Sequence, residues 1–155
     1  MPSIDVLTAA LDDAGVSYEL LEHPRTDRAA DEAATLGIPP NEVGKTIVLT
    51  AGDANVRVVL PASERIDMHK LRDLLGTGKE LHLLTEVDLA RSYPGFELGA
   101  VPPLGGPTDE VVVDAHIAAL EHVVFEAGQH DRSVRVPAAE LVSATGARVA
   151  DVSVD

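Results

Sequence analysis

β-Branched residues dominate the run Lys45-Thr46-Ile47-Val48-Leu49-Thr50, and a second run, Val56-Arg57-Val58-Val59-Leu60, follows a turn-forming cluster at residues 52–55. β-Branched side chains favour the pleated surface of a strand, and Gly, Asp and Asn between two such runs favour a tight turn. The two runs therefore predict a β-hairpin, which is the clearest element of secondary structure in the chain.

Helices are predicted on both sides of the hairpin from apolar residues that recur three and four positions apart, beside capping residues and glycines. They cover residues 4–14, 28–36, 68–75, 86–92 and 137–143. Alternating or β-branched runs predict further strands at residues 16–20, 81–84, 111–113, 123–126 and 133–136. This order predicts a mixed α/β fold, and the short connections between strands favour antiparallel pairing in part of the sheet.

Composition limits the classes of protein that fit. The chain has 155 residues with neither an internal repeat nor a linker, so a single domain over residues 1–155 is expected. Its 26 acidic and 12 basic residues give a net charge of −14, which argues against a general binder of nucleic acid or membrane surfaces. It has no cysteine, which excludes disulfides and cysteine-bound metals. Aromatic residues are few, so the core is expected to be aliphatic. They are Tyr18, Tyr93, Phe96 and Phe125.

Targeting and cofactor motifs are not found. The stretch Met1-Pro2-Ser3-Ile4-Asp5 has no cationic flank and no long apolar run, so a cytoplasmic location is expected. The glycines of residues 99–106 do not form GxGxxG, and Gly44-Lys45-Thr46 lacks the upstream glycine of a P-loop. The histidines show no HxH or HExxH spacing, and no GxSxG nucleophile motif occurs. We therefore expect no cofactor, no metal and no obvious protein nucleophile.

Three features could carry chemistry, and each has a structural alternative. Lys45 opens an apolar strand, so its amine could contact a carbonyl or phosphate over a pocket, or could simply extend into solvent. Residues 99–105 are dense in Gly and Pro and could present backbone N–H groups to a developing oxyanion, or could be a rigid crossover. His130 follows Gly128 in a turn and could bond a ligand, or could be an ordinary solvated histidine.

Basic residues are unevenly distributed along the chain. None lies between Ser92 and His130, whereas eight of the 12 lie between Arg25 and Lys79. They could form a local patch for a short phosphodiester end, or could be solvated and paired with nearby acids. The eight are Arg25, Arg28, Lys45, Arg57, Arg65, Lys70, Arg72 and Lys79.

Several short motifs follow one another over nearly the whole chain: Tyr18-Glu19-Leu20-Leu21-Glu22-His23, Asp31-Glu32-Ala33-Ala34, Gly44-Lys45-Thr46-Ile47-Val48-Leu49, Gly99-Ala100-Val101-Pro102-Pro103-Leu104-Gly105 and Ala127-Gly128-Gln129-His130. In this order and spacing the chain resembles the YbaK/prolyl-tRNA synthetase-associated editing-domain family. The resemblance implies a mixed α/β fold with a curved, barrel-like, largely antiparallel sheet and flanking helices. It also implies hydrolysis of the ester that links a wrong amino acid to tRNA.

The same resemblance implies roles for individual residues. Lys45 matches the signature lysine of the family, which positions the acceptor end or the ester, and it is the expected catalytic residue. Gly99 and Pro103 match the ends of a GxxxP loop whose backbone faces the aminoacyl group, and His130 matches a pocket histidine that Gly128 helps to present. Tyr18 aligns with a pocket-side aromatic residue. The expected substrate-binding set is Tyr18, Thr46, Gly99, Ala100, Val101, Pro102, Pro103, Gly128 and His130.

The expected function is that of a freestanding trans-editing deacylase, in which the terminal ribose 2′-hydroxyl helps to activate water. Alanyl, seryl and cysteinyl esters are the natural candidates, because a pocket rejects larger side chains sterically. Some members carry asparagine after the lysine, whereas Thr46 stands here, so the amino acid stays open. The expected partners are the CCA end of a mischarged tRNA and, given the acidic charge, a synthetase. A non-catalytic module that binds an aminoacyl-adenosine-like ligand or a synthetase is an alternative, as is a hydrolase of another ester.

Overall fold

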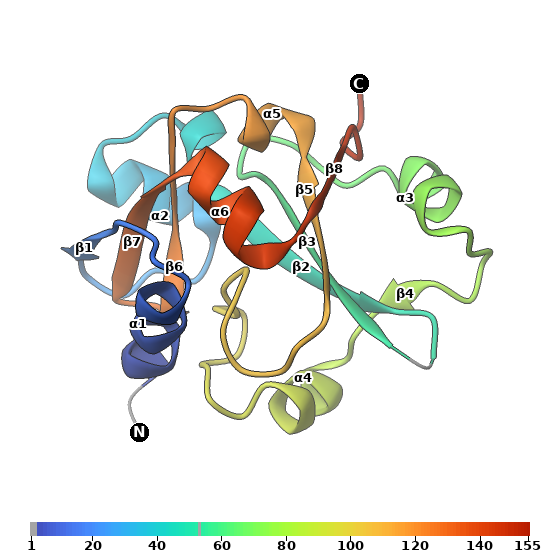
Figure 1. The fold of residues 1–155 in the computed structure, drawn as a ribbon, viewed down its shortest axis with the longest axis horizontal. Coiled ribbons are helices and arrows are strands. Elements are labelled where there is room, and N and C mark those ends of the chain that lie inside the picture. Colours follow the sequence, from blue (N-terminus) through green and yellow to red (C-terminus); the bar gives the residue numbers. More distant parts are fainter. Residues whose placement is uncertain (1–2, 53) are drawn as a thin grey trace.

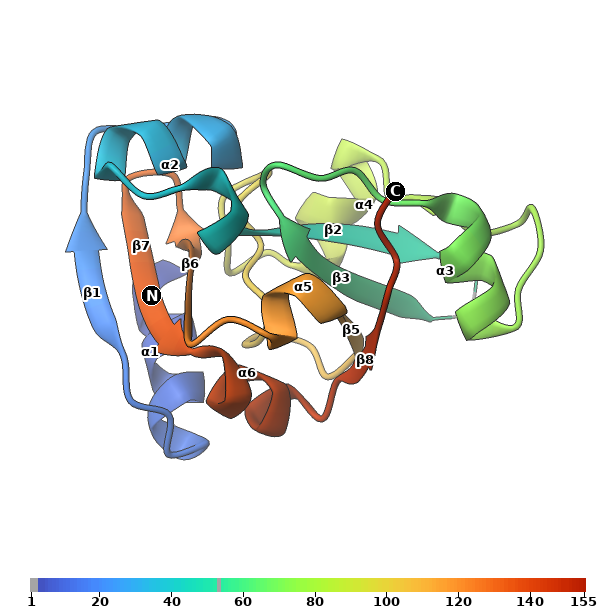
Figure 2. The same ribbon diagram turned by 90° about the horizontal axis from the view of Figure 1, so that it is seen from above.

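The computed structural model describes residues 3–52 and 54–155, whose strands form two sheets (Figure 1). The strands are β1 (Glu19–Glu22), β2 (Gly44–Thr50), β3 (Asn55–Pro61), β4 (His82–Leu83), β5 (Glu110–Asp114), β6 (His122–Gln129), β7 (Arg132–Pro137) and β8 (Arg148–Ala150). One sheet has the order β1-β7-β6, and the other has the order β4-β2-β3-β5-β8. Figure 2 shows the three-stranded sheet on the left and the five-stranded sheet on the right.

The predicted hairpin is confirmed, because β2 and β3 pair antiparallel from Gly44–Pro61 to Thr50–Asn55. Its turn includes Asp53, which lies outside the described residues. The pairs β3–β5 and β5–β8 are parallel, and the other strand pairs are antiparallel. The mixed α/β class with largely antiparallel pairing is therefore confirmed.

Helices surround the two sheets, and they end close to the predicted boundaries. The helices are α1 (Ser3–Asp13), α2 (Ala29–Leu36), the 3₁₀ helix η1 (Pro40–Glu42), α3 (Met68–Leu75), α4 (Glu86–Ser92), α5 (Ala115–Ala118) and α6 (Ala138–Thr145). Helix α5 and strand β8 were not predicted, because four and three residues are too few for a periodic signal. Across residues 3–52 and 54–155, no helix combines the length and apolar character that a bilayer crossing requires.

The sheets do not close into a barrel, which corrects one detail of the expected architecture. One isolated parallel β-bridge joins Val43, the residue just before β2, to Val124 of β6 between the two sheets. At this junction Gly44 packs tightly, since an added Cβ would lie 3.2 Å from Val123 Cγ2 and 3.3 Å from Val59 Cγ1. Beyond the bridge no ladder joins β2 to β6 within the described chain, so the sheets separate there.

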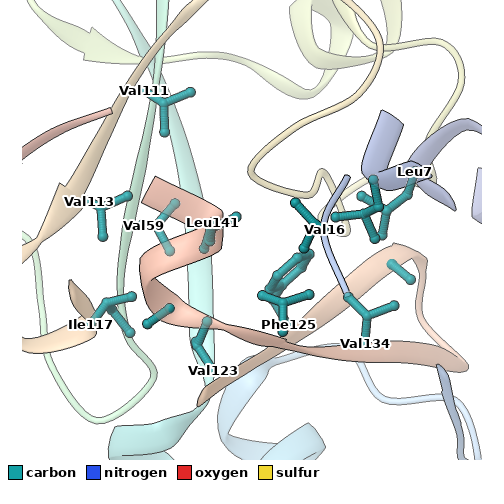
Figure 3. Close-up of a cluster of buried hydrophobic side chains, with 14 residues drawn as sticks. Leu7, Val16, Val59, Val111, Val113, Ile117, Val123, Phe125, Val134 and Leu141 are labelled. Carbon is teal, nitrogen blue, oxygen red and sulfur yellow. The ribbon is translucent and has the colours of Figure 1, made fainter. Parts of the chain in front are cut away.

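The main core lies between the sheets, α1, α5 and α6, and it is aliphatic as expected. Its members include Leu7 from α1, Ile117 from α5 and Leu141 from α6, all fully buried. Figure 3 shows these side chains around Phe125, which is the aromatic member of the cluster. A second cluster packs α3 against the five-stranded sheet through Leu71. Each such side chain contributes roughly 1.5–3 kcal/mol by leaving water.

The cap of α3 gives a local test of the described fold. Asp67 Oδ1 accepts hydrogen bonds from the backbone N–H groups of His69 and Lys70 at 3.0 and 3.1 Å. We expect Asp67→Ala to lower the free energy of unfolding by about 0.5–2 kcal/mol, because two N–H groups lose their acceptor. Urea denaturation measures this change. Asp67→Asn, which keeps an acceptor oxygen, should recover most of the stability, and equal losses in both variants would contradict the assigned cap.

Candidate active site

A cavity of about 390 Å³ opens where the two sheets separate. It lies beyond the bridge between Val43 and Val124, among the start of β2, the middle of β6, the N-terminal half of α2 and the loop after α4. Its lining consists of residues 27–30, 32, 44–47, 62, 99–101, 125 and 126. The unclosed edge between the sheets is thus the place where a small ligand can enter the fold.

Lys45 lines this cavity from the second position of β2, where it pairs with Leu60 of β3. Partial burial lowers the pKa of its amine, the nearby Arg65 guanidinium lowers the pKa further, and Glu64 opposes that shift. A cation in a partly desolvated cavity attracts a carbonyl or phosphate oxygen more strongly than it does in water. Thr46, the next residue, also lines the cavity.

The loop of residues 99–105 contributes Gly99, Ala100 and Val101 to the same cavity. Gly99 has a φ of +82°, which side-chain-bearing residues rarely adopt. Lys45 and the beginning of this loop are far apart in the sequence, yet they border one hollow. The arrangement sets an ammonium and a glycine-containing backbone around the same small volume.

Pro102 and Pro103, which belong to the expected substrate-binding set, lie outside the lining of this cavity. The carbonyl of Pro102 points to Arg57, whose Nη1 donates to it at 2.7 Å. Pro103 lines a different hollow, beside α1. The chain turns away from the cavity after Val101 because the following carbonyls serve the buried guanidinium.

Arg57 shapes this loop, a role that was not predicted from the sequence. Its side chain is 1% exposed, and its Nε lies 3.0 Å from an Asp109 carboxylate oxygen. Nη2 donates to the carbonyls of Gly105 and Pro107 at 2.7 and 3.0 Å. The guanidinium also lies 4.9 Å from the ring centroid of Tyr93. An arginine in an apolar strand run was the available signal, since a buried charge requires partners.

His130, an expected pocket residue, is buried behind the loop and lies outside the lining of this cavity. Its Nε2 lies 2.6 Å from the Leu98 carbonyl oxygen, and its ring lies against Gly99, where an added Cβ would be 3.5 Å from Cε1. Gly128 has a φ of +87° within the irregular pairing between Glu126 and Gln129, so it lets the strand turn toward His130. Gly128 acts on the loop as well, because its carbonyl accepts the Glu97 N–H at 2.8 Å.

Tyr18 lies at a separate hollow that also includes Arg135 and Pro137, and it packs against the main core. It therefore lies outside the lining of the cavity. The physical reason is its position just before β1, since β1 pairs with β7 at the far edge of the three-stranded sheet.

Two glutamates in the cavity lining were missed by the sequence analysis. Burial raises the pKa of Glu32 to about 8, and the neighbouring Glu126 carboxyl adds to this rise. Burial likewise raises the pKa of Glu126 to about 8, with a further contribution from Glu97. Ser133 Oγ donates to Glu32 Oε2 and lies 2.8 Å from His23 Nε2. These groups come together only in the folded chain, so no local sequence pattern identified them.

The eight basic residues between Arg25 and Lys79 do not all gather around the cavity. Arg28 and Lys45 are the cationic members of the cavity lining, whereas Arg57 is buried in the loop. Lys70 lies 2.9 Å from an Asp151 carboxylate oxygen and 2.8 Å from one of Asp155. Ion pairs of this kind match the alternative to a phosphate-binding patch, namely that the basic residues pair with nearby acids.

One cluster outside the cavity has a geometry that could hold a metal ion. Ligand atoms of Glu64, Asp114 and His116 all lie within 4.8 Å of one another. Their polar atoms already serve the protein, because Asp114 accepts the Val152 N–H at 3.0 Å and Glu64 pairs with His116 Nδ1 at 2.9 Å. The hydrogen bond that His116 Nδ1 donates to the Glu64 carboxylate raises the pKa of His116. The cluster is therefore explained by contacts within the fold.

Residues 23–144 match the family model described as the aminoacyl-tRNA editing domain. The chain belongs to the aminoacyl-tRNA editing domain family. Two relatives of this editing domain are proline–tRNA ligases from Lactobacillus helveticus (strain DPC 4571) and Lactobacillus acidophilus (strain ATCC 700396 / NCK56 / N2 / NCFM). They are 29% and 28% identical over 109 residues, which are 70% of this chain and 19% of each ligase. The chain thus spans about a fifth of the length of these relatives.

Solved structures share the fold of this editing domain over their full lengths. A crystal structure of the hypothetical protein APE2540 has a TM-score of 0.86 and 28% identity, and the match covers 95% of this chain and 98% of that one. A candidate trans-editing enzyme for prolyl tRNA synthetase has a TM-score of 0.88 and 24% identity, and the match covers 100% and 99%. The family resemblance inferred from the short motifs is confirmed by the family model that matches residues 23–144.

Proposed function

We propose that the protein is a freestanding trans-editing deacylase, which hydrolyses the ester of a mischarged tRNA carrying a small amino acid. The observation that carries the proposal is the meeting of Lys45 and the Gly99–Val101 backbone at one cavity in a chain of the editing-domain family. The cavity of about 390 Å³ suits an aminoacyl group and part of its terminal nucleoside. The rest of the tRNA would stay outside.

The proposed reaction needs no protein nucleophile. Water adds to the ester carbonyl carbon, the bond between that carbon and the ribose oxygen breaks, and the leaving oxygen takes a proton. The neighbouring ribose hydroxyl helps to activate the water. Lys45 holds the acceptor-end phosphate or the ester oxygen, and the backbone at Gly99, Ala100 and Val101 faces the aminoacyl group. The contribution of the protein is positioning together with electrostatic stabilisation.

Selection of the amino acid would be steric. The lining at Thr46, Ala100 and Val101 leaves room for a short side chain, so alanyl, seryl and cysteinyl esters are the proposed substrates. The net charge of −14 disfavours a broad grip on the tRNA body. We therefore propose that the protein binds the CCA end, that a synthetase contributes affinity, and that the reaction takes place in the cytoplasm.

A panel of charged tRNAs tests this function. We expect hydrolysis of Ala-, Ser- or Cys-charged tRNA well above the spontaneous rate, and little hydrolysis of esters with large side chains. Background-level hydrolysis across the whole panel would contradict the proposal. Tight binding of an aminoacyl-adenosine analogue without turnover would favour a non-catalytic module. A matched ester whose terminal ribose lacks the 2′-hydroxyl is the control for assistance by the substrate.

A further inference from the structure

The buried pair of His130 and Glu126 links the cavity lining to the loop that borders it. Nδ1 of His130 lies 2.8 Å from Glu126 Oε2, and these side chains are 4% and 10% exposed. Within the described chain, both atoms are buried and neither has a hydrogen-bond partner, so this close contact is the polar contact available to each of them. On the other side of the ring, Nε2 lies 2.6 Å from the Leu98 carbonyl oxygen. His130 therefore stands between a cavity carboxyl and the backbone just before Gly99.

Counting protons fixes the state of this pair. A carbonyl oxygen only accepts, so Nε2 of His130 must carry the proton that it donates to Leu98. If Nδ1 were then bare and Glu126 ionised, two lone pairs would face each other at 2.8 Å. One shared proton must therefore lie between Nδ1 and Oε2, whether it resides on the imidazole or on the carboxyl. With that proton present, Nε2–H stays directed at the loop.

We propose that Glu126 is a positioning residue, which holds the Gly99 loop at the cavity by sharing one proton with His130. This inference rests on the proposed deacylase function, because the loop backbone is the part expected to face the aminoacyl group. Two other contacts hold the same segment: Glu97 N–H donates to the Gly128 carbonyl at 2.8 Å, and His130 N–H donates to Glu97 Oε2 at 3.3 Å. The His130–Glu126 contact is the one that depends on a titratable proton.

Burial and nearby carboxylates favour retention of the proton on Glu126 at neutral pH. Burial, Glu97 and Asp27 together raise the pKa of Glu126 to about 8 against the opposing effect of Arg25. The Arg25 guanidinium also pairs with Glu97 at 3.0 Å, and this pairing weakens the effect of each group on the pKa of Glu126. Glu32 on α2 faces the same space as a second carboxyl whose pKa is raised. Raising the pH above about 8 therefore removes the shared proton.

Loss of this proton should release the loop. The single remaining ring proton can serve either Glu126 at Nδ1 or the Leu98 carbonyl at Nε2, and the other contact becomes repulsive. We therefore expect deacylation to decline by about tenfold per pH unit above a midpoint near 8, after subtraction of spontaneous ester hydrolysis at each pH.

Glu126→Gln separates positioning from simple structural support. A glutamine amide can donate to Nδ1 and keep Nε2–H on Leu98, but it does not titrate. We expect E126Q to keep most of the neutral-pH kcat and to lose the decline near pH 8, whereas E126L should lower kcat by at least about tenfold with a smaller effect on KM. Glu121→Gln is the matched control, since this side chain is 92% exposed, and it should leave the pH profile unchanged.

Carboxyl ¹³C NMR of Glu126 reads the same proton without any substrate, so it separates this inference from the proposed function. We expect the Glu126 carboxyl of the wild type, assigned with the E126Q variant, to titrate with a midpoint near 8. A Glu126 carboxyl that already ionises well below neutral pH, or an activity decline that persists in E126Q, would overturn the inference. If the NMR result holds and no charged tRNA is hydrolysed, the proton sharing is supported and the deacylase function fails.

Discussion

Lys45→Ala should lower deacylation by at least about a hundredfold, because removal of one preorganised electrostatic partner typically has an effect of this size. The amine lies at the cavity wall next to Thr46, and partial burial lowers its pKa, so water would replace it only poorly as a partner for an oxyanion or phosphate. Single-turnover hydrolysis of the preferred charged tRNA measures the loss.

The same variant should leave the fold almost unchanged. Lys45 is only partly buried, and truncation of such a side chain typically alters the free energy of unfolding by less than about 1 kcal/mol. Lys79→Ala removes an exposed lysine in the loop after α3 and should affect neither rate nor melting temperature. If Lys45→Ala collapsed the fold, or if it retained full activity, Lys45 would be a structural residue.

Arg57→Met should destabilise the protein by about 3–5 kcal/mol, which is the usual effect of removing one member of a buried ion pair. Methionine fills similar space but leaves the Asp109 carboxylate without its cation. It also leaves the carbonyls of Pro102, Gly105 and Pro107 without a donor. Since domains are typically stable by only about 5–15 kcal/mol, this loss is severe.

Urea denaturation of three variants measures the contribution of Arg57. Arg57→Lys keeps the charge but lacks the planar fork that reaches several acceptors at once, so it should fall between wild type and Arg57→Met. Arg91→Met removes an exposed arginine of α4, 76% exposed and 3.8 Å from Asp88, and should change stability by less than about 0.5 kcal/mol. A loss below about 1 kcal/mol in Arg57→Met would show that the loop keeps its shape without the guanidinium.

Local chemistry explains why much of the fold was predictable. The β2–β3 hairpin follows from its β-branched runs, and α3 follows from the Asp67 cap, its apolar face and the terminating Gly76. Each of these signals lies within a few residues of the structure that it specifies. The separation of the two sheets is different in kind, because it depends on how Val43 and Val124 meet across the fold.

The candidate site was predictable only in part, for the same reason. Lys45 and Gly99 were found from the motifs, and the fold brings them to one cavity. Arg57 and Glu32 act through partners that are distant in sequence, so neighbouring residues did not identify those partners. Glu126 lies four residues before its partner His130, but their contact depends on the irregular strand between them. His130, which the motifs placed near the ligand, is buried behind the loop, where its ring contacts the Leu98 carbonyl.

Backbone NMR with a non-hydrolysable aminoacyl-adenosine amide tests the central claim most directly. Binding should shift the amide resonances of Thr46 and Ile47 on β2 together with those of Gly99, Ala100 and Val101 on the loop, because both segments line one cavity. The resonances of residues 103–108, around the hollow beside α1, should stay in place. Saturable shifts confined to that second hollow, with β2 and residues 99–101 unaffected, would contradict the account.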